Sequence, residues 1–491
     1  MIVFWLALAA LALLLLIMGI RTARFTRKAE EFQPPVEVED QVSNQEVADH
    51  LAAVIRCATV SHADPEQVDW SEFEKLHNCL RELYPNVHRV MEREQLGGYN
   101  LIYRWRGTNP NRKPIAFLSH QDVVPIGDET EWKLPPFSGL DDGENIHGRG
   151  ALDMKQQMVM VMDACERLIA QGYTPEEDVY LCFGQNEEVG NIPDMTGADL
   201  LAHTLKERGI RFDCVIDEGG TIVSGKTFGI KPRVAVIGVT EKGFCDFRLE
   251  AESEGGHASR PPKRTALGRV CEAAYRLETH PPKPEMLAPI RTMFETVAPY
   301  MKSLPIRFMV ANLWLCKGLF MRMASSTSSL MRAVFADSFA LTQAEGSPQD
   351  NILAQHPWVG INCRILPSSS ADKAKEHIRK VIRDPKVKIT ITKYHQDHSI
   401  SPHNTKAFAT IDAITNRYYP GTLVTPYIQF GGSDSRNYYC VSENVYRFMP
   451  VFLEHDVNEY GVHRANEYLP KAVLGRGVAF FMDFIKEYKG E

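Results

Sequence analysis

Apolar runs of strand length alternate with helical patterns along the chain from about residue 45. The runs at residues 115–118, 179–183 and 214–216 predict buried strands. Between the first two, residues 155–169 have the length and the apolar spacing of a helix. Strands separated by a helix in this way are typical of an α/β sheet with parallel strands.

The pattern changes in the region 236–398. Residues 244–251 and 387–394 alternate apolar and polar side chains, as half-exposed strands do. Helical patterns follow each of these strands at residues 266–277 and 371–382. We therefore predict that this region forms a separate α+β domain.

The chain then returns to helical patterns at residues 406–417 and 471–489. The most economical organisation is one α/β domain, formed by residues 45–235 and 399–491, into which the α+β domain is inserted. The length of 491 residues agrees with two domains, because single hydrophobic cores rarely grow beyond about 250–300 residues.

The first 20 residues carry no charged side chain. A helix of that length spans about 30 Å, which matches the hydrocarbon core of a bilayer. Four basic residues follow the apolar run, namely Arg21, Arg24, Arg27 and Lys28. A signal peptide has its basic residues before a shorter run, so residues 1–28 predict a single-pass transmembrane anchor with a basic flank. A cleaved signal peptide is the alternative.

Residues 29–44 are acidic, contain a proline pair and predict a linker. The basic flank of the anchor favours a cytoplasmic position for the residues after it. This rule is weak for large domains, which are translocated largely regardless of charge. The side of the membrane therefore stays open at this point.

Within the predicted insertion, residues 293–342 are unusually apolar and rich in methionine. Lys317 and Arg322 interrupt the apolar run, so it is a poor candidate for a second transmembrane helix. We expect additional helices that pack on the insertion. The alternative is a surface that faces lipid or an acyl chain.

Charge and cysteine content exclude several classes of protein. The net charge is −7 and the pI about 6.2, so the sequence does not favour a nucleic-acid partner. The ten cysteines are scattered and form no CxxC pair. This pattern argues against a disulfide framework and against a zinc site built from thiolates.

Polar side chains follow each predicted strand of the α/β domain. His120 and Asp122 come after the first strand, Glu187 and Glu188 after the second, and Asp217 after the third. Ligand sites of open α/β sheets lie at the carboxyl ends of the strands. One carboxylate of an adjacent pair can bind a metal ion while the other transfers protons.

Further candidates lie in glycine-rich or loop sequences. Asp153, in HGRGALDMK, is either a helix-terminal carboxylate or a bridge between two metal ions. His257 lies in EGGHASRPP, His463 in YGVHRANE, and Ser433 and Arg436 in FGGSDSRNY. Taken singly, the last four are better explained as plain loops or turns, whereas the two explanations of Asp153 are about equal. In their joint order, however, the histidine, aspartate and glutamate side chains offer nitrogen and oxygen ligands without thiolate, which suits a pair of divalent ions such as Zn²⁺.

In this order the motifs resemble a family of metallopeptidases. HQDVVP, GRGALDMK, NEEVG, DEGG, GGHAS, GGSDSR and HRANE are similar to motifs of the family that holds aminoacylase, carboxypeptidase S, glutamate carboxypeptidase and succinyl-diaminopimelate desuccinylase. The resemblance runs from about residue 47 to 489. The apolar segment 293–342 looks most like the branch of N-fatty-acyl-amino acid synthase/hydrolases and carboxypeptidase S.

The resemblance implies an α/β catalytic domain of the di-metal exopeptidase type, with a mixed, largely parallel sheet. It also implies that the inserted domain at 236–398 serves as a lid and as a dimerisation domain. Five residues match metal ligands of the family: His120, Asp153 as the bridging carboxylate, Glu188, Asp217 and His463. Glu187 matches the general base, and Asp122 matches the aspartate that supports the site.

Substrate contacts follow from the same resemblance. His257, in the lid, matches a histidine that reaches a substrate oxyanion, in some relatives across a dimer. Arg436 resembles the residue that holds the substrate carboxylate. Asn351 and Arg364 match lid motifs with weaker substrate contacts, and Ser433 belongs to the same motif as Arg436.

The chain departs from the common pattern near the glutamate pair. Gln185 and Asn186 stand where relatives often have His-Asp, which affects the surroundings of the site but none of the expected ligands. The glycine-rich loop after the pair is replaced by residues 191–197, which we expect to reshape the rim of the pocket. Met154 replaces a frequent aspartate, as it does in aminoacylase.

The resemblance therefore implies a hydrolase with two divalent metal ions, most simply Zn²⁺, that cleaves the amide bond of N-acyl amino acids. A carboxypeptidase acting on dipeptides or short peptides is the first alternative. An inactive, membrane-anchored binding protein on the same fold is the second. The resembling enzymes act in secreted or vacuolar settings, in contrast to the cytoplasmic side that the basic flank favours.

Overall fold

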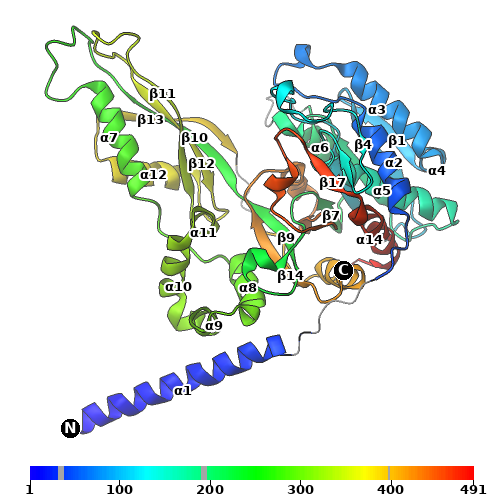
Figure 1. Ribbon diagram of the computed structural model, residues 1–491, viewed down its shortest axis with the longest axis horizontal. Coiled ribbons are helices and arrows are strands. Elements are labelled where there is room, and N and C mark those ends of the chain that lie inside the picture. The colour runs from blue at the N-terminus through cyan, green and yellow to red at the C-terminus, as the bar shows by residue number, and fades with distance from the viewer. Residues whose placement is uncertain (31, 33–37, 190–195, 396–398, 491) are drawn as a thin grey trace.

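The computed structural model describes residues 1–30, 32, 38–189, 196–395 and 399–490. Two sheets lie in two separate parts of the molecule, and the apolar first helix projects from the base of the smaller part (Figure 1). The boundary that we place at residue 398 falls outside the described residues. The exact limits of the two domains therefore stay predictions.

The larger part is built on a mixed, ten-stranded sheet. Its order is β1-β2-β6-β3-β7-β15-β9-β8-β16, and β14 pairs with β9. Strand pairs β3–β6, β3–β7, β7–β15 and β9–β14 are parallel. The strands are β1 Glu92–Leu96, β2 Asn100–Trp105, β3 Ile115–His120, β6 Val179–Gly184, β7 Cys214–Asp217, β8 Ile222–Val223, β9 Val234–Glu241, β14 Leu423–Gln429, β15 Val445–Arg447 and β16 Phe452–Leu453.

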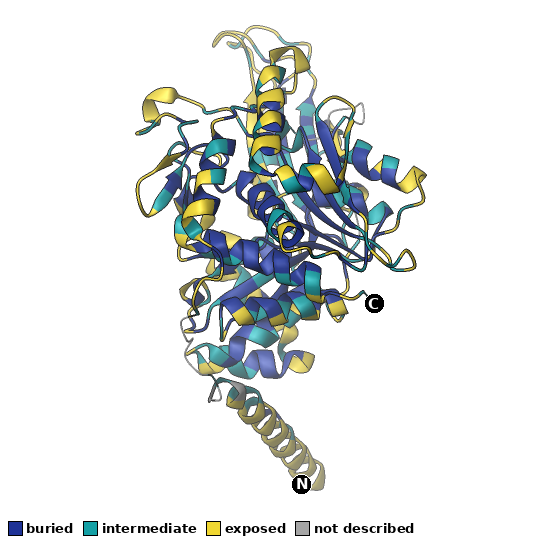
Figure 2. Ribbon diagram, turned by 90° about the vertical axis from the view of Figure 1, so that its right-hand side faces the viewer, coloured by how far each residue is buried: buried dark blue, intermediate teal, exposed yellow. Residues whose placement is uncertain are grey.

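Helices cover both faces of this sheet because its strands are apolar on both faces. In β3, Ile115 and Phe117 belong to one core and Ala116 and Leu118 to the other, as the two-residue period of a strand requires. The dark interior of Figure 2 is this pair of cores. The first core is packed by α2 Asn44–Ile55, α4 Pro85–Val90, α5 Lys155–Ala170, α13 Lys406–Tyr418 and α14 Leu474–Glu487, and the second by α6 Ala198–Glu207.

The predicted elements of this part are confirmed, with one shift at the end of the chain. The last α-helix begins at Leu474 and not at residue 471, because Lys471–Val473 forms a short 3-10 turn before it. A third sheet of three short strands joins distant segments of the chain: β4 Leu140–Asp141, β5 Asn145–His147 and β17 Tyr468–Pro470. This small sheet brings the last loop of the chain next to the HGRGALDMK segment.

The smaller part is a four-stranded antiparallel sheet of order β11-β12-β10-β13. Two helices pack on the sheet, α7 Ala266–Thr279 and α12 Ala371–Ile382 (Figure 1). Both helices and both strands that the sequence predicts here are confirmed. The strands are β10 Gly243–Ala251, β11 Ser338–Glu345, β12 Trp358–Ile365 and β13 Val387–His395. We call this part, together with the helices described next, the lid, after the role that the resemblance implies.

The apolar segment of the lid forms four short helices and no membrane-spanning one. Their buried side chains form a separate core that also contains Ile428 of β14, so the expected packing role of this segment is confirmed. The helices are α8 Ala288–Val297, α9 Leu304–Ala311, α10 Leu313–Thr327 and α11 Ser329–Phe335. Their outer face is taken up again below.

Helix α1, Ile2–Glu30, is long and apolar enough between Ile2 and Arg27 to cross a bilayer. It is almost entirely exposed along its first two thirds (Figure 2). Contacts with the rest of the chain begin at Met18, which is buried, and continue at Thr22 and Phe25. The helix is therefore a candidate membrane anchor, and an N-terminal signal sequence has the same properties.

Candidate active site

The polar residues that follow the central strands meet at one edge of the ten-stranded sheet. His120 is the last residue of β3 and lies opposite Gly184, the last residue of β6. Glu187 and Glu188 follow β6 in a short 3-10 turn, and β7 ends at Asp217. Parallel strands end at the same edge, so these segments come together although they are far apart in the sequence.

Asp153 lies between the two predicted ligand histidines. Its Oδ1 atom is 3.3 Å from Nε2 of His120, and its Oδ2 atom is 3.0 Å from Nε2 of His463. Each carboxylate oxygen thus faces a different histidine. Glu188 joins the His463 side, where its Oε2 atom lies 3.1 Å from the same Nε2 atom. Shared between two histidines, Asp153 has the position of a bridging carboxylate.

Glu218, and not Asp217, completes the His120 side. The Oε1 atom of Glu218 is 3.5 Å from Nε2 of His120. The carboxylate of Asp217 instead accepts a hydrogen bond from the backbone N–H of Ser435 at 2.7 Å. The Oδ1 atom of Asp217 is buried without a hydrogen-bond partner among the described residues, so its role as a ligand stays a prediction. Sequence analysis missed Glu218, although its position next to Asp217 in DEGG was a usable signal.

The cluster has the chemistry of a cation site. Four partly buried carboxylates, those of Asp153, Glu187, Glu188 and Glu218, lie around two histidines, of which His120 is buried and His463 is exposed. Hydrogen bonds to Asp153 and Glu188 raise the pKa of His463 to about 10. Burial raises the pKa of Glu187 and of Glu218 well above the usual value. The negative charge thus needs compensation, and the donor set fits divalent ions.

An unsatisfied atom supports the same fit. The Oε1 atom of Glu188 is buried and has no hydrogen-bond partner among the described residues. Buried carboxylate oxygens are normally hydrogen-bonded or bound to a metal ion. A divalent ion on the His463 side would bind this oxygen atom, to which no described protein group donates a hydrogen bond.

Asp122 connects the glutamate pair with His120 through hydrogen bonds, and its supporting role in catalysis stays a prediction. Its carboxylate accepts hydrogen bonds from the backbone N–H groups of Glu187 and Glu188, both at 3.1 Å, and from the hydroxyl of Ser61 at 2.6 Å. The Nδ1 atom of His120 lies 2.9 Å from the backbone carbonyl of Asp122. With Nδ1–H donating to that carbonyl, Nε2 is the atom free to bind a metal ion.

Glu467 holds the loop that carries Asp153, a role that sequence analysis did not assign. Its buried carboxylate accepts hydrogen bonds from the guanidinium of Arg149 and from the backbone N–H groups of Gly150, Leu152 and Asp153. The residue belongs to the same HRANE motif as His463. The HRANE motif therefore supplies His463 and, through Glu467, holds the loop that carries the candidate bridging carboxylate.

The predicted substrate residues of the GGSDSR motif have different surroundings. The side chain of Arg436 is 9% exposed, its NH1 atom is 4.0 Å from Glu241, and its Nε atom has no hydrogen-bond partner among the described residues. Ser433 is fully buried, and its hydroxyl and backbone N–H both donate to Glu241. The hydroxyl of Ser433 is thus engaged with Glu241, and its predicted contact with substrate stays a prediction.

The predicted lid residues do not join the cluster. His257 is exposed on the loop between β10 and α7, and its Nδ1 atom accepts a hydrogen bond from Ser259. This loop lies at the end of the lid sheet that points away from the ten-stranded sheet (Figure 1). Asn351 is exposed on the facing loop, and Arg364 lies over the ring of Phe244. Substrate contacts of these three residues stay predictions.

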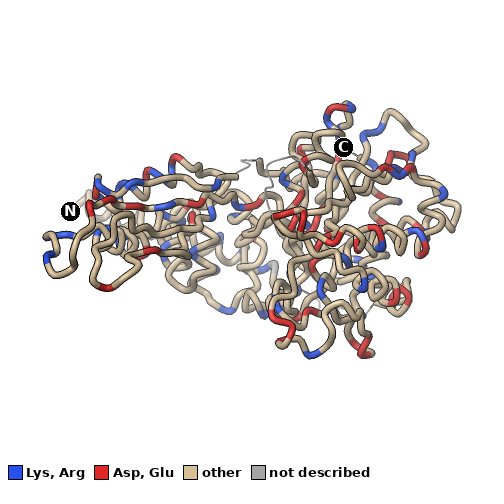
Figure 3. Tube along the Cα trace, turned by 90° about the horizontal axis from the view of Figure 1, so that it is seen from above, with Lys and Arg blue, Asp and Glu red and all other residues tan. Residues whose placement is uncertain are grey.

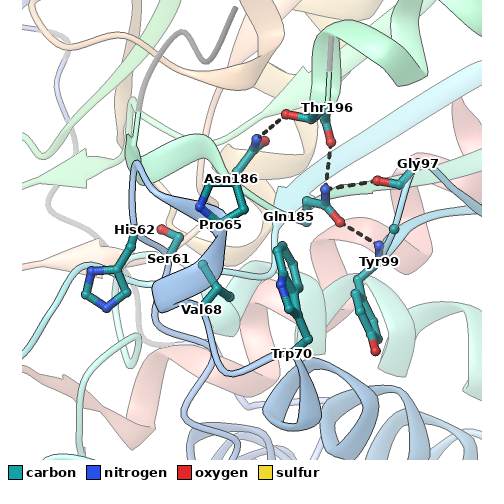
Figure 4. A pocket seen from close by; sticks show the side chains of 11 residues that line it. Ser61, His62, Pro65, Val68, Trp70, Gly97, Tyr99, Gln185, Asn186 and Thr196 are labelled. Atoms are coloured by element: carbon teal, nitrogen blue, oxygen red, sulfur yellow. Dashed lines mark hydrogen bonds between the residues drawn. The ribbon is translucent and has the colours of Figure 1, made fainter. Parts of the chain in front are cut away.

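A pocket of about 480 Å³ opens beside Gln185 and Asn186 (Figure 4). These two residues begin the loop that carries Glu187 and Glu188, which we call the glutamate loop. Trp70 and Tyr99 form one wall, with their rings stacked 5.4 Å apart. Gln185 forms another wall and holds the turn at Gly97 and Tyr99 by hydrogen bonds. The predicted effect of residues 191–197 on the pocket rim falls largely outside the described residues.

Comparison with known proteins agrees with the fold. The model of Peptidase family M20/M25/M40 matches residues 116–487 of the chain. Since this match covers most of the chain, the protein belongs to that family of metallopeptidases. The resemblance noted in the sequence is confirmed, and with it a hydrolase class that acts on peptide or amide bonds.

The individual relatives have names of two kinds, carboxypeptidase and N-fatty-acyl-amino acid synthase/hydrolase. A probable carboxypeptidase S-like protein of Dictyostelium discoideum is 32% identical over 96% of this chain and 92% of its own length. An N-fatty-acyl-amino acid synthase/hydrolase of Mus musculus is 29% identical over 94% of this chain and 91% of its own length. Among solved structures, an M20 family metallo-carboxypeptidase of Sulfolobus solfataricus has a TM-score of 0.63 at 15% identity, covering 90% of this chain and 98% of that one.

Proposed function

We propose that this protein is a membrane-anchored hydrolase that cleaves the amide bond of N-acyl amino acids. The observation that carries the proposal is the position of Asp153, whose two oxygens face His120 and His463. This arrangement supports two ion sites that share one carboxylate. The apolar pocket next to the glutamate loop supports an acyl group as the second part of the substrate.

The two divalent ions, which we take as Zn²⁺, would be held in a symmetric way. His120 and Glu218 would bind one ion, His463 and Glu188 the other, and Asp153 both. When bound, such ions lower the pKa of a water molecule and polarise the carbonyl of the substrate. Imidazole and carboxylate ligands without thiolate suit a catalytic zinc pair.

Glu187 would act as the general base. Its carboxylate takes a proton from the attacking water as the new C–O bond forms. It then delivers that proton to the amide nitrogen as the C–N bond breaks, which releases a fatty acid and an amino acid. Burial raises the pKa of Glu187, so the side chain is suited to hold a proton for this short interval.

Arg436 would hold the carboxylate of the amino-acid part. Its guanidinium is nearly buried and has donor capacity to spare, because its Nε atom has no partner among the described residues. A guanidinium pairs with a carboxylate through two parallel hydrogen bonds, which fixes the position of the scissile bond. Glu241 and Ser433 keep the segment before Arg436 in place.

His257 would stabilise the oxyanion that forms on the carbonyl oxygen. Because its loop lies away from the cluster, this role requires that the lid closes or that a second copy of the chain supplies the residue. Closure of the lid and dimerisation through the lid are both predicted functions of this domain. A homodimer through the lid therefore remains part of the proposal.

The test is the release of free amino acid by the full chain in detergent. A long-chain N-acyl-phenylalanine and a dipeptide are compared, each with a chelator and after Zn²⁺ is restored. We expect chelator-sensitive release from the acyl substrate. Release mainly from the dipeptide would establish the carboxypeptidase, which the relative from Dictyostelium discoideum supports equally. A folded chain that binds no metal and releases no amino acid would support the alternative of an inactive binding protein.

A further inference from the structure

Helix α10 carries apolar side chains on its exposed side as well as on its buried side. Leu313, Phe320 and Met321 are buried against the lid core. The exposed half carries Leu315 (53% exposed), Leu319 (59%) and Met323 (43%) at the spacing i, i+4, i+8, and Trp314 (56%) at its edge. Exposed apolar side chains that gather on one face mark a contact surface more often than scattered ones do.

This face begins where the chain is tied to the candidate anchor. At the junction of α9 and α10, the amide of Asn312 donates to the backbone carbonyl of Met18 and to the hydroxyl of Thr22. From the other side, the Nε atom of Arg21 donates to the carbonyl of Ala311 at 3.3 Å. Helix α1 also packs along α9. The junction therefore holds α10 close to the point where α1 leaves the globular part.

The charge of the segment is one-sided. Between Glu295 and Asp337 the chain has no acidic residue, but it has five basic ones: Lys302, Arg307, Lys317, Arg322 and Arg332. Lys317 and Arg322 are both exposed on α10, with Arg322 between Trp314 and Leu315 around the helix axis and Lys317 on the far side of Trp314. In the tube view, acidic segments are more frequent in the part with the ten-stranded sheet than around these helices (Figure 3). Basic side chains around exposed apolar ones are typical of helices that lie in the headgroup region of a membrane.

We propose that the apolar face of α10 inserts into the headgroup region of an anionic bilayer, as a membrane contact of the chain in addition to α1. The inference rests on α1 being an anchor, because α1 sets the face next to the bilayer. Trp314 lies at the start of α10, and indole side chains favour the interface between lipid and water. The side chains of Lys317 and Arg322 would interact with lipid phosphates.

A second copy of the chain is a poorer occupant of this face. In a symmetric dimer the same surface contacts itself, so the basic side chains of both copies would come together. Repulsion between like charges would oppose that contact, whereas anionic lipid would be attracted.

The experiment follows tryptophan quenching by lipids brominated in their acyl chains. The full chain is reconstituted into vesicles of phosphatidylcholine and phosphatidylglycerol, with and without brominated lipid. Trp5 reports on the anchor and Trp314 on α10. We expect that Trp314→Phe removes roughly half of the quenched signal and that Trp5→Phe removes a similar share, because both indoles would contact lipid. Trp132→Phe, in the larger part of the molecule, should leave the quenched signal unchanged.

The two variants separate the two hypotheses. If Trp5 is quenched and Trp314 is not, α1 is an anchor and the contact through α10 is refuted. If neither is quenched, the anchor fails together with the inference that rests on it. As a further arm, Leu319→Asp should abolish the Trp314 signal, while Leu140→Asp at an exposed leucine of β4 should preserve it. Equal thermal unfolding of both variants would show that the loss reflects lipid contact.

Discussion

Arg149 and Glu467 form a buried ion pair at 2.8 Å, although 318 positions separate them in the chain. The carboxylate of Glu467 also accepts three backbone N–H groups of the loop that ends at Asp153. The geometry of the candidate bridging residue therefore depends on a residue from the last motif of the chain. This dependence leads to the first prediction.

Glu467→Gln should lower the free energy of unfolding by about 3 kcal/mol, because the change leaves the buried Arg149 without its counter-charge. The amide would also place N–H donors against the backbone N–H groups of the loop. Chemical denaturation of the full chain in detergent measures the effect. Glu129→Gln, at an exposed glutamate, is the control and should leave stability within about 0.5 kcal/mol. An equal effect of both changes would contradict the structural role.

Glu187→Gln should keep the bound metal but lose roughly three to four decades of turnover. The amide is similar in size to the carboxylate but does not accept a proton from water. Metal content by elemental analysis and turnover by amino-acid release are measured on the same sample. Turnover near the wild-type level would remove Glu187 from the role of general base.

Glu218→Gln and Asp217→Asn should have different effects on metal content. Glu218 lies beside His120, so its replacement should reduce the bound metal from about two equivalents to about one. Asp217 is bonded to the backbone of Ser435, so its replacement should retain both equivalents. Equilibrium dialysis followed by elemental analysis distinguishes the two. The reverse pattern would restore Asp217 as the ligand.

Trp70→Ala should impair long-chain substrates selectively. The side chain forms a wall of the apolar pocket, and losing its contact with an acyl chain should cost about 2 kcal/mol, or roughly 30-fold in kcat/KM. The kcat/KM for an N-acetyl amino acid should be nearly unchanged, and Trp70→Phe should restore part of the long-chain activity. A uniform loss for all chain lengths would show that Trp70 only stabilises the fold.

Acid should destabilise the protein through His77. Burial lowers the pKa of His77 to about 4, and the ring lies 2.7 Å from the amide oxygen of Gln121. The unfolded chain, with a pKa near 6.5, binds the proton first as pH falls. This residue alone should therefore reduce the free energy of unfolding by about 1.4 kcal/mol per pH unit between about pH 6.5 and 4. The slope in that window should be smaller in His77→Asn.

The sequence alone determined the elements and the family. Buried strands read as unbroken apolar runs, and amphipathic helices keep their spacing, so β3, β6, β7, α5, α7 and α12 were predictable from local pattern. The order of the motifs identified the family, because seven weak signals in a fixed order are specific together. Local pattern also identified α1, because the length and composition of its apolar run are evident without knowledge of tertiary contacts.

The tertiary structure decided which side chains meet. Asp217 and Glu218 are equivalent by sequence, but the direction of each side chain at the end of β7 sends one to Ser435 and the other to His120. Ser433 belongs to a site motif and is nevertheless buried against Glu241. Likewise, the support of Asp153 by Glu467 exists only because β17 pairs with β5. Contacts between distant segments depend on chain topology, and local periodicity contains no information on them.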